Sequence, residues 1–460
     1  MTHQCLVGID NGGTVAKAAV FACDGRELAV ASSKTEVLAP QPGWAEFDAD
    51  RLWQATASAV RQALSRAGVR GQDVAAVACT GHGNGIYLVA AEGRAVRRAI
   101  FSSDSRARAY VQRWTAEGVD RAVRPKTMQA LWPGQPNALL AWLRDHEPDV
   151  LRSARWVLMC KDFIRLRLTG EAYAEVTDAS GTSLMDVGTG QHDPQILEAF
   201  GIAEIRDKLP PVRQSADVCG RVTPAAADLT GLAPGTPVAG GLFDIDACAL
   251  SSALTDESQL GMTLGTWGIN QYVSRTPVAE GVFMTSRYCV PGYYLMLEGS
   301  ATSASNLEWF LSHFFQAEAS RQEGRSIYDR ANQLVAESGA SESGLMFVPF
   351  LYGSNASPDA TACLVGMRAS DGPGHVLRAV YEGVLFAHMT HWERLLEVRA
   401  RPERIRASGG GARSDVWMQM VADAFQVPVE VPEGTELGAL GAAICAGVAA
   451  GCHPSYEAAC

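Results

Sequence analysis

The sequence of 460 residues lacks several patterns that mark common classes of protein. Its 39 Lys and Arg residues form no cluster, and they are outnumbered by 50 Asp and Glu residues, for a formal net charge of −11. Nucleic acids and anionic membranes favour basic patches, so we expect neither as a partner. A phosphorylated ligand is compatible with this balance, because a few local donors and a metal ion can hold phosphate on an acidic protein.

Cysteine pairs are also missing, although the chain has 11 cysteines. They form no Cys-x-x-Cys motif, and several lie in apolar runs such as VAAVAC, which ends at Cys79, and AAIC, which ends at Cys445. Scattered cysteines in apolar surroundings are typical of small core residues in a reducing compartment. We therefore expect no disulfide framework and no zinc site, and we predict a cytoplasmic location.

No apolar run is long enough to span a bilayer. The longest uncharged stretch, LGALGAAICAGVAAG at 437–451, consists mostly of Gly and Ala, and it predicts a buried helix instead. The first residues, MTHQCLVGID, reach Asp10 too early for the apolar core of a signal peptide.

Common catalytic motifs are absent as well. The chain contains no G-x-S-x-G, no H-E-x-x-H and no Walker G-x-x-x-x-G-K-[ST]. His388 and His391 in HMTH share a helix face, but no third ligand follows at a recognisable spacing. We expect these histidines to be hydrogen-bonded within the protein or to face solvent.

What is present is an alternation of strand and helix patterns. A strand–turn–strand pattern covers 4–22, an amphipathic helix pattern ends at Gly68, and a short apolar strand follows at 73–81. This alternation predicts an α/β domain. Two stretches rich in Pro and Gly, 224–241 and 353–360, predict loops.

A similar design returns in the second half of the chain. Residues 258–274 are again strand, Gly-Thr turn and strand, and 403–425 are strand, Gly-rich turn and helix. The turns NGGT and LGTWG lie about 250 residues apart, which predicts two related α/β halves, joined near residue 245, with a cleft between them.

The segment GIDNGGTVAK is a candidate phosphate loop. Gly12 and Gly13 let the backbone approach a ligand closely, and Thr14 and Lys17 add donors. Asp10, at the end of a buried strand, can hold Mg²⁺ through water. The alternative is a plain hairpin turn, since Asn-Gly is a leading hairpin signal.

Three further segments carry polar groups that are candidates for ligand binding or catalysis. SGGGARSDVWMQM leaves room for the adenosine end of a nucleotide, with Ser414 or Asp415 as helix cap, or it is only a Gly-rich connection. FSSDSRA places Asp104 near Arg106, which suits a polyol or, on spacing alone, a surface ion pair. GGLFDIDACAL places Asp244 and Asp246 in an apolar run, where carboxylates rarely lie without a task or partner.

Together these motifs resemble the FGGY carbohydrate kinases, members of the actin-like ATPase superfamily, over essentially the whole chain. The resemblance rests on GIDNGGTVAK, QPGWAEFDADRLW, GQPNALLAWLRDH, KDFIRLRLTGE, TDASGTSLMD and ACLVGMRASDGPGHVLRAVYE. Gly13 stands where Thr or Ser is commoner, and Leu139 where the family usually has Lys. Within the family, PQPGWAE, SSDSRA and SDVWMQM are most similar to L-xylulose kinases, also called 3-keto-L-gulonate kinases.

The resemblance implies two ribonuclease-H-like domains of the actin-like ATPase type around a central cleft. Residues 1–243 would form the N-terminal domain with the sugar site and first phosphate loop, and 244–460 the C-terminal, nucleotide-binding domain. It also implies transfer of the γ-phosphoryl group of ATP, with Mg²⁺, to a primary hydroxyl of a small-molecule sugar.

The resemblance further assigns roles to single residues. Asp244 matches the general base, and Asp10 orients Mg²⁺ through water. Asp246 falls where related sequences often have uncharged residues, so it would be structural or adjacent to the metal. The ligand-binding residues that it implies are Gly12, Gly13, Thr14, Lys17, Gly265, Thr266, Gly410 and Ser414 for ATP, and Gly83, Asn84, Asp104 and Asp244 for the sugar, with Trp267 as a wall of the site.

Several alternatives stay open. The substrate can be L-xylulose or a similar ketose, or D-xylulose, ribulose or erythritol, because specificity depends on a few side chains of the pocket. Relatives in this superfamily also act as non-catalytic sugar sensors, chaperones or filaments. A homodimer is open too, since family members often form dimers.

Overall fold

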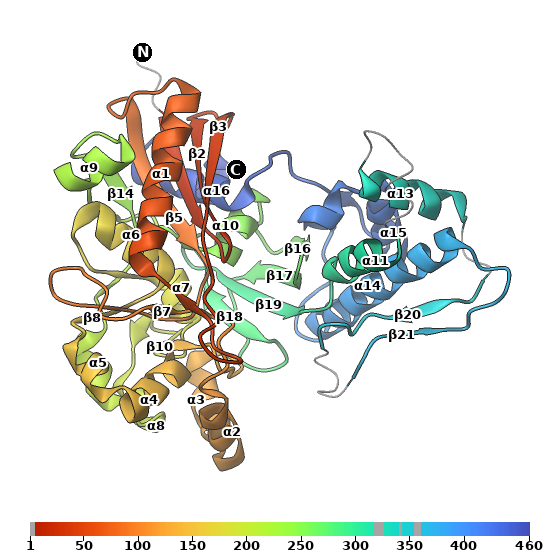
Figure 1. Ribbon diagram of the computed structural model, residues 1–460, viewed down its shortest axis with the longest axis horizontal. Coiled ribbons are helices and arrows are strands. Elements are labelled where there is room, and N and C mark those ends of the chain that lie inside the picture. Colours follow the sequence, from red (N-terminus) through yellow and green to blue (C-terminus); the bar gives the residue numbers. More distant parts are fainter. Residues whose placement is uncertain (1–4, 316–325, 340–342, 354–359) are drawn as a thin grey trace.

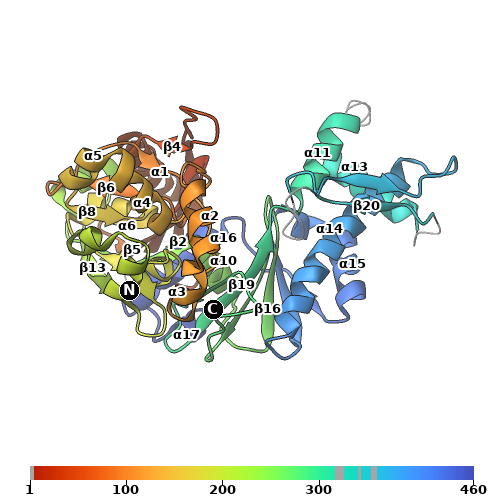
Figure 2. The same cartoon turned by 90° about the horizontal axis from the view of Figure 1, so that it is seen from below.

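The computed structural model describes residues 5–315, 326–339, 343–353 and 360–460. Two main sheets organise the chain into two lobes (Figure 1). One sheet lies inside the N-terminal lobe, and the other lies between that lobe and a group of C-terminal helices (Figure 2). The predicted α/β class with two halves is confirmed.

The sheet of the N-terminal lobe has the strand order β13-β14-β5-β1-β2-β3, and β15 pairs with β5. Strand β1 (Cys5–Asn11) is antiparallel to β2 (Val15–Ala22) and parallel to β5 (Val74–Gly81). From Cys5 onward, the strands predicted for the start of the chain are therefore present. The other strands of this sheet are β3 (Glu27–Lys34), β13 (Val218–Arg221), β14 (Pro237–Ala239) and β15 (Leu242–Phe243).

The second sheet repeats this arrangement, with the order β18-β19-β17-β16-β22-β23. Strand β16 (Gln259–Leu264) is antiparallel to β17 (Gly268–Ser274) and parallel to β22 (Arg404–Ser408), as β1 is to β2 and β5. The prediction of two halves of related design is confirmed. The other strands are β18 (Met284–Arg287), β19 (Tyr294–Ser300) and β23 (Val429–Glu430).

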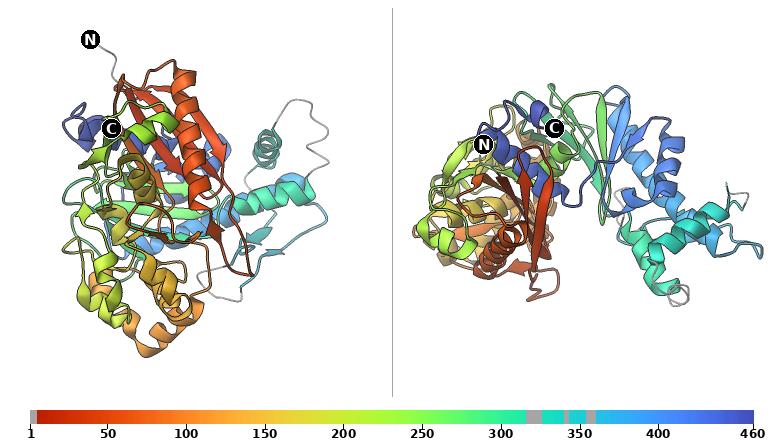
Figure 3. Two further views of the ribbon diagram at one scale, coloured as in Figure 1. Left: turned by 60° about the vertical axis from the view of Figure 1, so that its left-hand side comes forward. Right: turned by 90° about the horizontal axis from the view of Figure 1, so that it is seen from above.

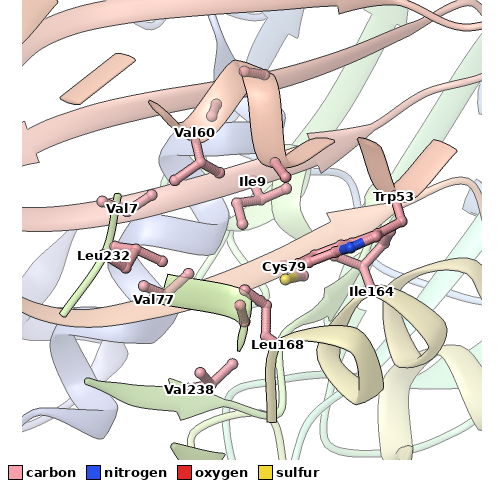
Figure 4. Close-up of a cluster of buried hydrophobic side chains, with 14 of the residues drawn as sticks. Val7, Ile9, Trp53, Val60, Val77, Cys79, Ile164, Leu168, Leu232 and Val238 are labelled. Carbon is pink, nitrogen blue, oxygen red and sulfur yellow. The ribbon is translucent and has the colours of Figure 1, made fainter. Parts of the chain in front are cut away.

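Helix α1 (Ala49–Ala67) covers one face of the N-terminal sheet. The Asp48 carboxylate caps its first turn, and Gly68, in the left-handed conformation at φ 66°, ends it as predicted. Trp53 and Val60 on its buried side join the apolar core that fills this side of the sheet (Figure 4).

Helix α16 (Leu437–Ala449) covers the opposite face of the same sheet, against β1 and β5. A Cβ atom on Gly8 would lie 1.8 Å from the Ala439 carbonyl oxygen, so only glycine permits this close approach. The predicted buried helix is confirmed. Although α16 comes from the second half of the sequence, it completes the N-terminal lobe, and the C-terminus lies beside that lobe (Figure 3). The domain division at residues 243 and 244 stays a proposal.

The helices of the C-terminal lobe pack on the face of the second sheet that points away from the N-terminal lobe (Figure 2). The elements that follow β19, apart from β22, β23 and α16, are α11 (Ser305–Phe314), α13 (Ile327–Glu337), β20 (Met346–Val348), β21 (Cys363–Val365), α14 (Pro373–Leu396), η2 (Gly410–Arg413), α15 (Asp415–Phe425) and α17 (Tyr456–Ala459).

The rest of the N-terminal lobe consists of short elements around the main sheet. They are β4 (Glu46–Phe47), β6 (Tyr87–Val89), β7 (Ala99–Ile100), α2 (Arg108–Glu117), α3 (Val119–Thr127), α4 (Pro136–His146), α5 (Pro148–Ser153), β8 (Trp156–Leu158), α6 (Cys160–Thr169), β9 (Ala174–Glu175), α7 (Val176–Ser180), β10 (Met185–Asp186), β11 (Gln191–His192), α8 (Pro194–Ala199), η1 (Ala203–Lys208), β12 (Val212–Arg213), α9 (Pro224–Thr230) and α10 (Asp244–Ser251).

One loop prediction was wrong in part. The stretch 224–241 contains helix α9 and strand β14. Pro224 occupies the first helical position, where its missing N–H costs no hydrogen bond, and the Thr223 hydroxyl accepts the Ala226 amide. The other predicted loop, 353–360, lies largely outside the described residues.

Two expectations about side chains are confirmed. None of the 11 cysteines forms a disulfide. His388 and His391 are buried and hydrogen-bonded: His388 Nδ1 lies 3.1 Å from Asn270 Oδ1, and His391 Nε2 lies 3.0 Å from Ser300 Oγ. Within the described part of the chain, no helix has the length and apolarity that crossing a membrane requires.

Candidate active site

Three strand ends of the N-terminal sheet meet at one edge. Gly81, the last residue of β5, pairs with Asn11 at the end of β1 on one side and with Phe243 at the end of β15 on the other. All three strands run parallel, so their carboxyl ends point the same way. Because open α/β sheets bind ligands at this edge, the segments that follow these strands form the candidate active site.

Asp244 follows β15 directly and is the first residue of α10. Its Oδ1 accepts the backbone amide of Ile245 at 2.8 Å, and none of the ion pairs among the described residues involves its carboxylate. Burial, and then the charges of Asp10 and Asp178, raise its pKa to about 8. An unpaired carboxylate with a raised proton affinity at a strand end is well suited to accept a proton.

Asp246 lies two residues further on and has different surroundings. It is fully buried, and neither of its carboxylate oxygens has a hydrogen-bond partner among the described residues. Burial raises its pKa well above the usual value, with nearby acids adding to the effect. The Asp244 carboxylate accepts a backbone amide and that of Asp246 accepts no hydrogen bond among the described residues, so the two acids of this segment are not equivalent.

Asp10 lies near the end of β1, and burial raises its pKa to about 6. Lys17, opposite Asp10 on β2, lowers that pKa, but the Lys17 Nζ also lies 2.7 Å from Glu436 Oε2. On the other side, a Cβ atom on Gly438 would lie 2.5 Å from Asp10 Oδ2. Glycine near the start of α16 therefore makes room for the carboxylate beside a helix N-terminus, which favours negative charge.

The turn between β1 and β2 consists of Gly12, Gly13 and Thr14. The Gly12 amide donates to the Val15 carbonyl at 3.1 Å, so this segment is a hairpin turn. Thr14 is exposed, and the two glycines are half-buried. The hairpin description and the phosphate-loop description are thus compatible, and the use of this turn for phosphate stays a proposal.

The predicted sugar-binding turn follows β5. Gly83 lies under the Phe243 ring, where a Cβ atom would come within 1.9 Å of a ring carbon. Asn84 is buried in the left-handed conformation at φ 58°, and its Oδ1 has no hydrogen-bond partner among the described residues. Since buried amide oxygens are rarely left unpaired, this group suits a hydroxyl donor from a ligand.

Asp104 is engaged with the protein itself. Its carboxylate forms two 2.9 Å hydrogen bonds with the Arg106 guanidinium and accepts the Ala45 amide at 2.6 Å. The guanidinium carbon of Arg106 lies 3.7 Å from the Trp44 ring centroid and 5.0 Å from that of Trp142. The ion pair expected from the spacing exists, but it is fully buried rather than at the surface. Contact of Asp104 with a sugar stays a proposal.

Leu139 is fully buried in α4, in an apolar cluster that includes Ile86 and Ile196. A leucine packs in this cluster without needing an ion-pair partner. Packing therefore accounts for leucine at a position where the family that the sequence resembles usually has lysine.

In the second sheet, two loops leave adjacent parallel strands. Thr263 on β16 pairs with Ser408 on β22, and their hydroxyl oxygens lie 3.0 Å apart. Gly265 and Thr266 follow the first strand. Thr266 and Trp267 line a cavity of about 440 Å³ together with residues of α11, and Trp267 is 52% exposed.

The loop after β22 contains Gly410 and leads to Ser414. Gly410 is exposed, and a Cβ atom there would have no neighbour within 4 Å. Ser414 caps α15, as one of the two predicted caps: its Oγ accepts the Trp417 amide at 3.1 Å and donates to Asn332 Oδ1 at 2.6 Å. The Gly410 backbone is open to a ligand, whereas the Ser414 hydroxyl is already committed within the protein.

One group of charged residues was not assigned a role from the sequence. Lys161 in α6 is fully buried, and its Nζ lies 2.9 Å from Asp162, 3.4 Å from Glu175 and 3.3 Å from Asp178. Burial raises the pKa of Asp178 to about 7 despite the nearby lysine. Lys161 and Asp162 belong to KDFIRLRLTGE and Asp178 to TDASGTSLMD, and Glu175 lies between the two motifs, so the charges in and between them were the available signal.

No group of three or more His, Cys, Asp or Glu side chains suited to a metal ion occurs among the residues that the structure describes. Asp10, near the end of β1, offers a carboxylate close to the β1–β2 turn. One carboxylate fits a Mg²⁺ ion that is held mainly by nucleotide phosphates and waters.

Comparison with known proteins identifies both halves of the chain. The model for the FGGY family of carbohydrate kinases, N-terminal domain, matches residues 5–251, and the model for its C-terminal domain matches residues 260–450. The L-xylulose/3-keto-L-gulonate kinase of Escherichia coli is 39% identical over 99% of this chain and 90% of its own length. A probable L-xylulose kinase of Pasteurella multocida is 39% identical over 96% and 89%. The crystal structure of xylulose kinase from Rhodospirillum rubrum superposes with a TM-score of 0.89 and 29% identity, covering 99% and 92%.

Proposed function

The chain belongs to the FGGY family of carbohydrate kinases, and from this premise we propose that it phosphorylates a pentulose, with L-xylulose as first candidate. In this proposal the γ-phosphoryl group of ATP is transferred to a primary hydroxyl, and Asp244 accepts the hydroxyl proton. The relatives named for L-xylulose support the substrate class, as does the structural relative named for xylulose.

One observation carries the assignment of the base. Asp244 lies at the junction of β15 and α10 with a raised pKa and without an ion pair among the described residues, whereas Asp104 is committed to Arg106. Phosphoryl transfer needs little covalent help from the protein. It needs an in-line hydroxyl, neutralised phosphate charge and one carboxylate to take the proton.

The sugar would lie between Asp244 and the turn after β5. In this position Asn84 Oδ1 would gain the hydroxyl donor that it lacks among the described residues, and the Gly83 backbone would stay close because no side chain intervenes. Ionised Asp244 would hold the primary hydroxyl by a hydrogen bond and take its proton as the bond to phosphorus forms.

The nucleotide would occupy the glycine-rich loops. We propose that the backbone amides at Gly12, Gly13 and Thr14, and at Gly265 and Thr266, hold the phosphates, since open backbone N–H groups form anion sites. Lys17 would contribute charge after release from Glu436, and the Gly410 loop would receive the adenosine, with Ser414 fixing the start of α15 behind it.

Mg²⁺, which Asp10 would orient through water, supplies neutralisation of phosphate charge when it is bound. The Asp10 carboxylate fits this task because Gly438 leaves it room and no ion pair among the described residues engages it. The proposal also includes a cytoplasmic location and a homodimer. Light scattering of the purified protein tests the homodimer directly.

A coupled assay of ADP release tests the function. We expect turnover that depends on sugar, highest with L-xylulose or 3-keto-L-gulonate and lower with D-xylulose, D-ribulose and erythritol. Sugar binding without ADP release would identify a sensor, and ATP hydrolysis that ignores sugar would identify a chaperone-type ATPase. Either result would overturn the proposed function.

A further inference from the structure

A chain of buried hydrogen bonds connects α7 with the backbone amide of Phe243, the residue before Asp244. Thr177, fully buried in α7, is its centre. The Thr177 Oγ1 accepts the Phe243 amide at 2.9 Å and donates to Glu175 Oε2 at 2.7 Å. A single hydroxyl group thus joins α7 to the end of β15.

The acceptor of that hydroxyl is itself held from several sides. Glu175 is fully buried, and its Oε1 accepts the Ser215 hydroxyl at 2.6 Å and the Thr177 amide at 3.0 Å. Lys161 Nζ lies 3.4 Å from Glu175 Oε2 and supplies the opposite charge. Because this network fixes Glu175, the O–H of Thr177 points toward the Glu175 carboxylate. A lone pair of the Thr177 oxygen then accepts the Phe243 amide.

The position of Phe243 determines two parts of the site. Its backbone leads directly into Asp244, and its ring lies over Gly83 of the predicted sugar-binding turn. The hydrogen-bond donors to the Asp244 carboxylate are the backbone amides of Ile245, at 2.8 Å, and of Asp244 itself. The orientation of its carboxylate therefore depends on the backbone that carries it.

We propose that Thr177 is a positioning residue for phosphoryl transfer. By holding the Phe243 peptide, its hydroxyl sets the carboxylate of Asp244 against the sugar-binding turn, without touching the substrate itself. The proposal rests on Asp244 as the general base. Small displacements of a reacting group are costly, so loss of this bond affects turnover more than binding.

The test compares Thr177→Val, which keeps the shape and removes the hydroxyl, with Thr177→Ser, which keeps the hydroxyl. Thr230→Val is the matched control. Thr230 is also fully buried, donates to the Ala226 carbonyl at 2.8 Å and accepts the Leu232 amide at 3.3 Å, but it lies at the end of α9 with no bond to β15.

We expect Thr177→Val to lower kcat by about 10²-fold while KM for sugar and for ATP changes by less than about threefold. Thr177→Ser should restore kcat to within about threefold of the native value. Thr230→Val should lower Tm by an amount similar to Thr177→Val and leave kcat unchanged. If both valine variants lose Tm equally and keep native kcat, Thr177 is only structural and the proposal is overturned.

Two further variants keep the test decisive. Should Thr177→Val show no cooperative melting, Thr177→Cys replaces it, because a thiol is a weak acceptor of similar size. The expected kcat is then between those of the serine variant and an inactive protein, and native kcat would overturn the proposal. Asp244→Asn separates the two hypotheses: turnover in that variant overturns the proposed base, whereas an inactive Asp244→Asn beside a fully active Thr177→Val overturns only the role of Thr177.

Discussion

The two main sheets have the same pairing pattern around their first strands, but their strand ends carry different chemistry. The end of β1, the segment after β15 and the nearby α7 present Asp10, Asp244 and Asp178, whose pKa values burial raises to about 6, 8 and 7. The segments after β16 and β22 present glycines and Thr266 and no acid. The same topology thus has an acidic side, at the strand ends of the N-terminal sheet, that is suited to hold a metal ion and accept a proton. It also has a neutral side, at the strand ends of the second sheet, that a polyanion can approach. Chemistry follows from the residues placed on a fold and not from the fold.

Removing the central acid should give the largest effect. We expect Asp244→Asn to lower kcat by about 10²- to 10⁴-fold with native folding, because a general base contributes on this scale. Steady-state ADP release measures the loss, and circular dichroism checks the fold. Asp246→Asn is the internal control, with an expected loss below about tenfold. An equal loss of kcat in the two variants would refute the assignment of the general base to Asp244 and not to Asp246.

The second acid of the same side should have a smaller effect with a distinct signature. Asp10→Asn should lower kcat by about 10²-fold and raise the Mg²⁺ concentration that gives half-maximal activity, because a carboxylate that orients the ion is lost. Titration of activity with Mg²⁺ at saturating ATP measures both changes. An unchanged Mg²⁺ requirement would remove Asp10 from the proposed metal site.

A change on the neutral side should affect only the nucleotide. Gly410→Val should raise KM for ATP by about tenfold and leave KM for sugar unchanged, because a Cβ atom there has no neighbour within 4 Å and the new side chain would extend into the space open to adenosine. Gly372→Val is the matched control, since a Cβ atom at Gly372 also meets nothing within 4 Å. If both variants behave alike, the Gly410 loop does not contact ATP.

The smallest expected effect concerns pH. Asp244 must be ionised to accept a proton, and its pKa is raised to about 8, so kcat/KM should increase as pH rises through neutrality. The negative charge of Asp178 contributes to this raised pKa. Asp178→Asn should therefore move the acidic limb of the profile to lower pH, with a gain of less than about tenfold in kcat/KM between about pH 7 and 8, where Asp178 is ionised in the native protein. A shift to higher pH would contradict the electrostatic coupling of the two acids.

Much of the architecture was predictable because it depends on local patterns. The apolar strand before Asp10, the capped helix that ends at Gly68 and the repeated strand–turn–strand of 258–274 each follow from periodicity and turn residues. The helix in 224–241 differs from the loop prediction because Pro and Gly are typical of loops, whereas Pro at a first helical position and Gly at an end are also helix boundaries.

The environment of each polar group was not predictable in the same way. Spacing indicated an ion pair at Asp104 and Arg106 but not its burial beside Trp44 and Trp142, since these rings come from segments distant in sequence. Likewise, the contact between Lys161 and Asp178 joins two motifs that the sequence does not connect.

The sequence by itself determined the α/β class, the duplicated halves, the family and the candidate acids, because these depend on residue types and on order along the chain. Only the tertiary structure decided that Asp244 and Asp246 have unequal surroundings, that Gly438 of the last long helix makes room for Asp10, and that Thr177 joins α7 to the strand before Asp244. The physical reason is that proton affinity and hydrogen bonding depend on burial and on neighbours brought together by folding.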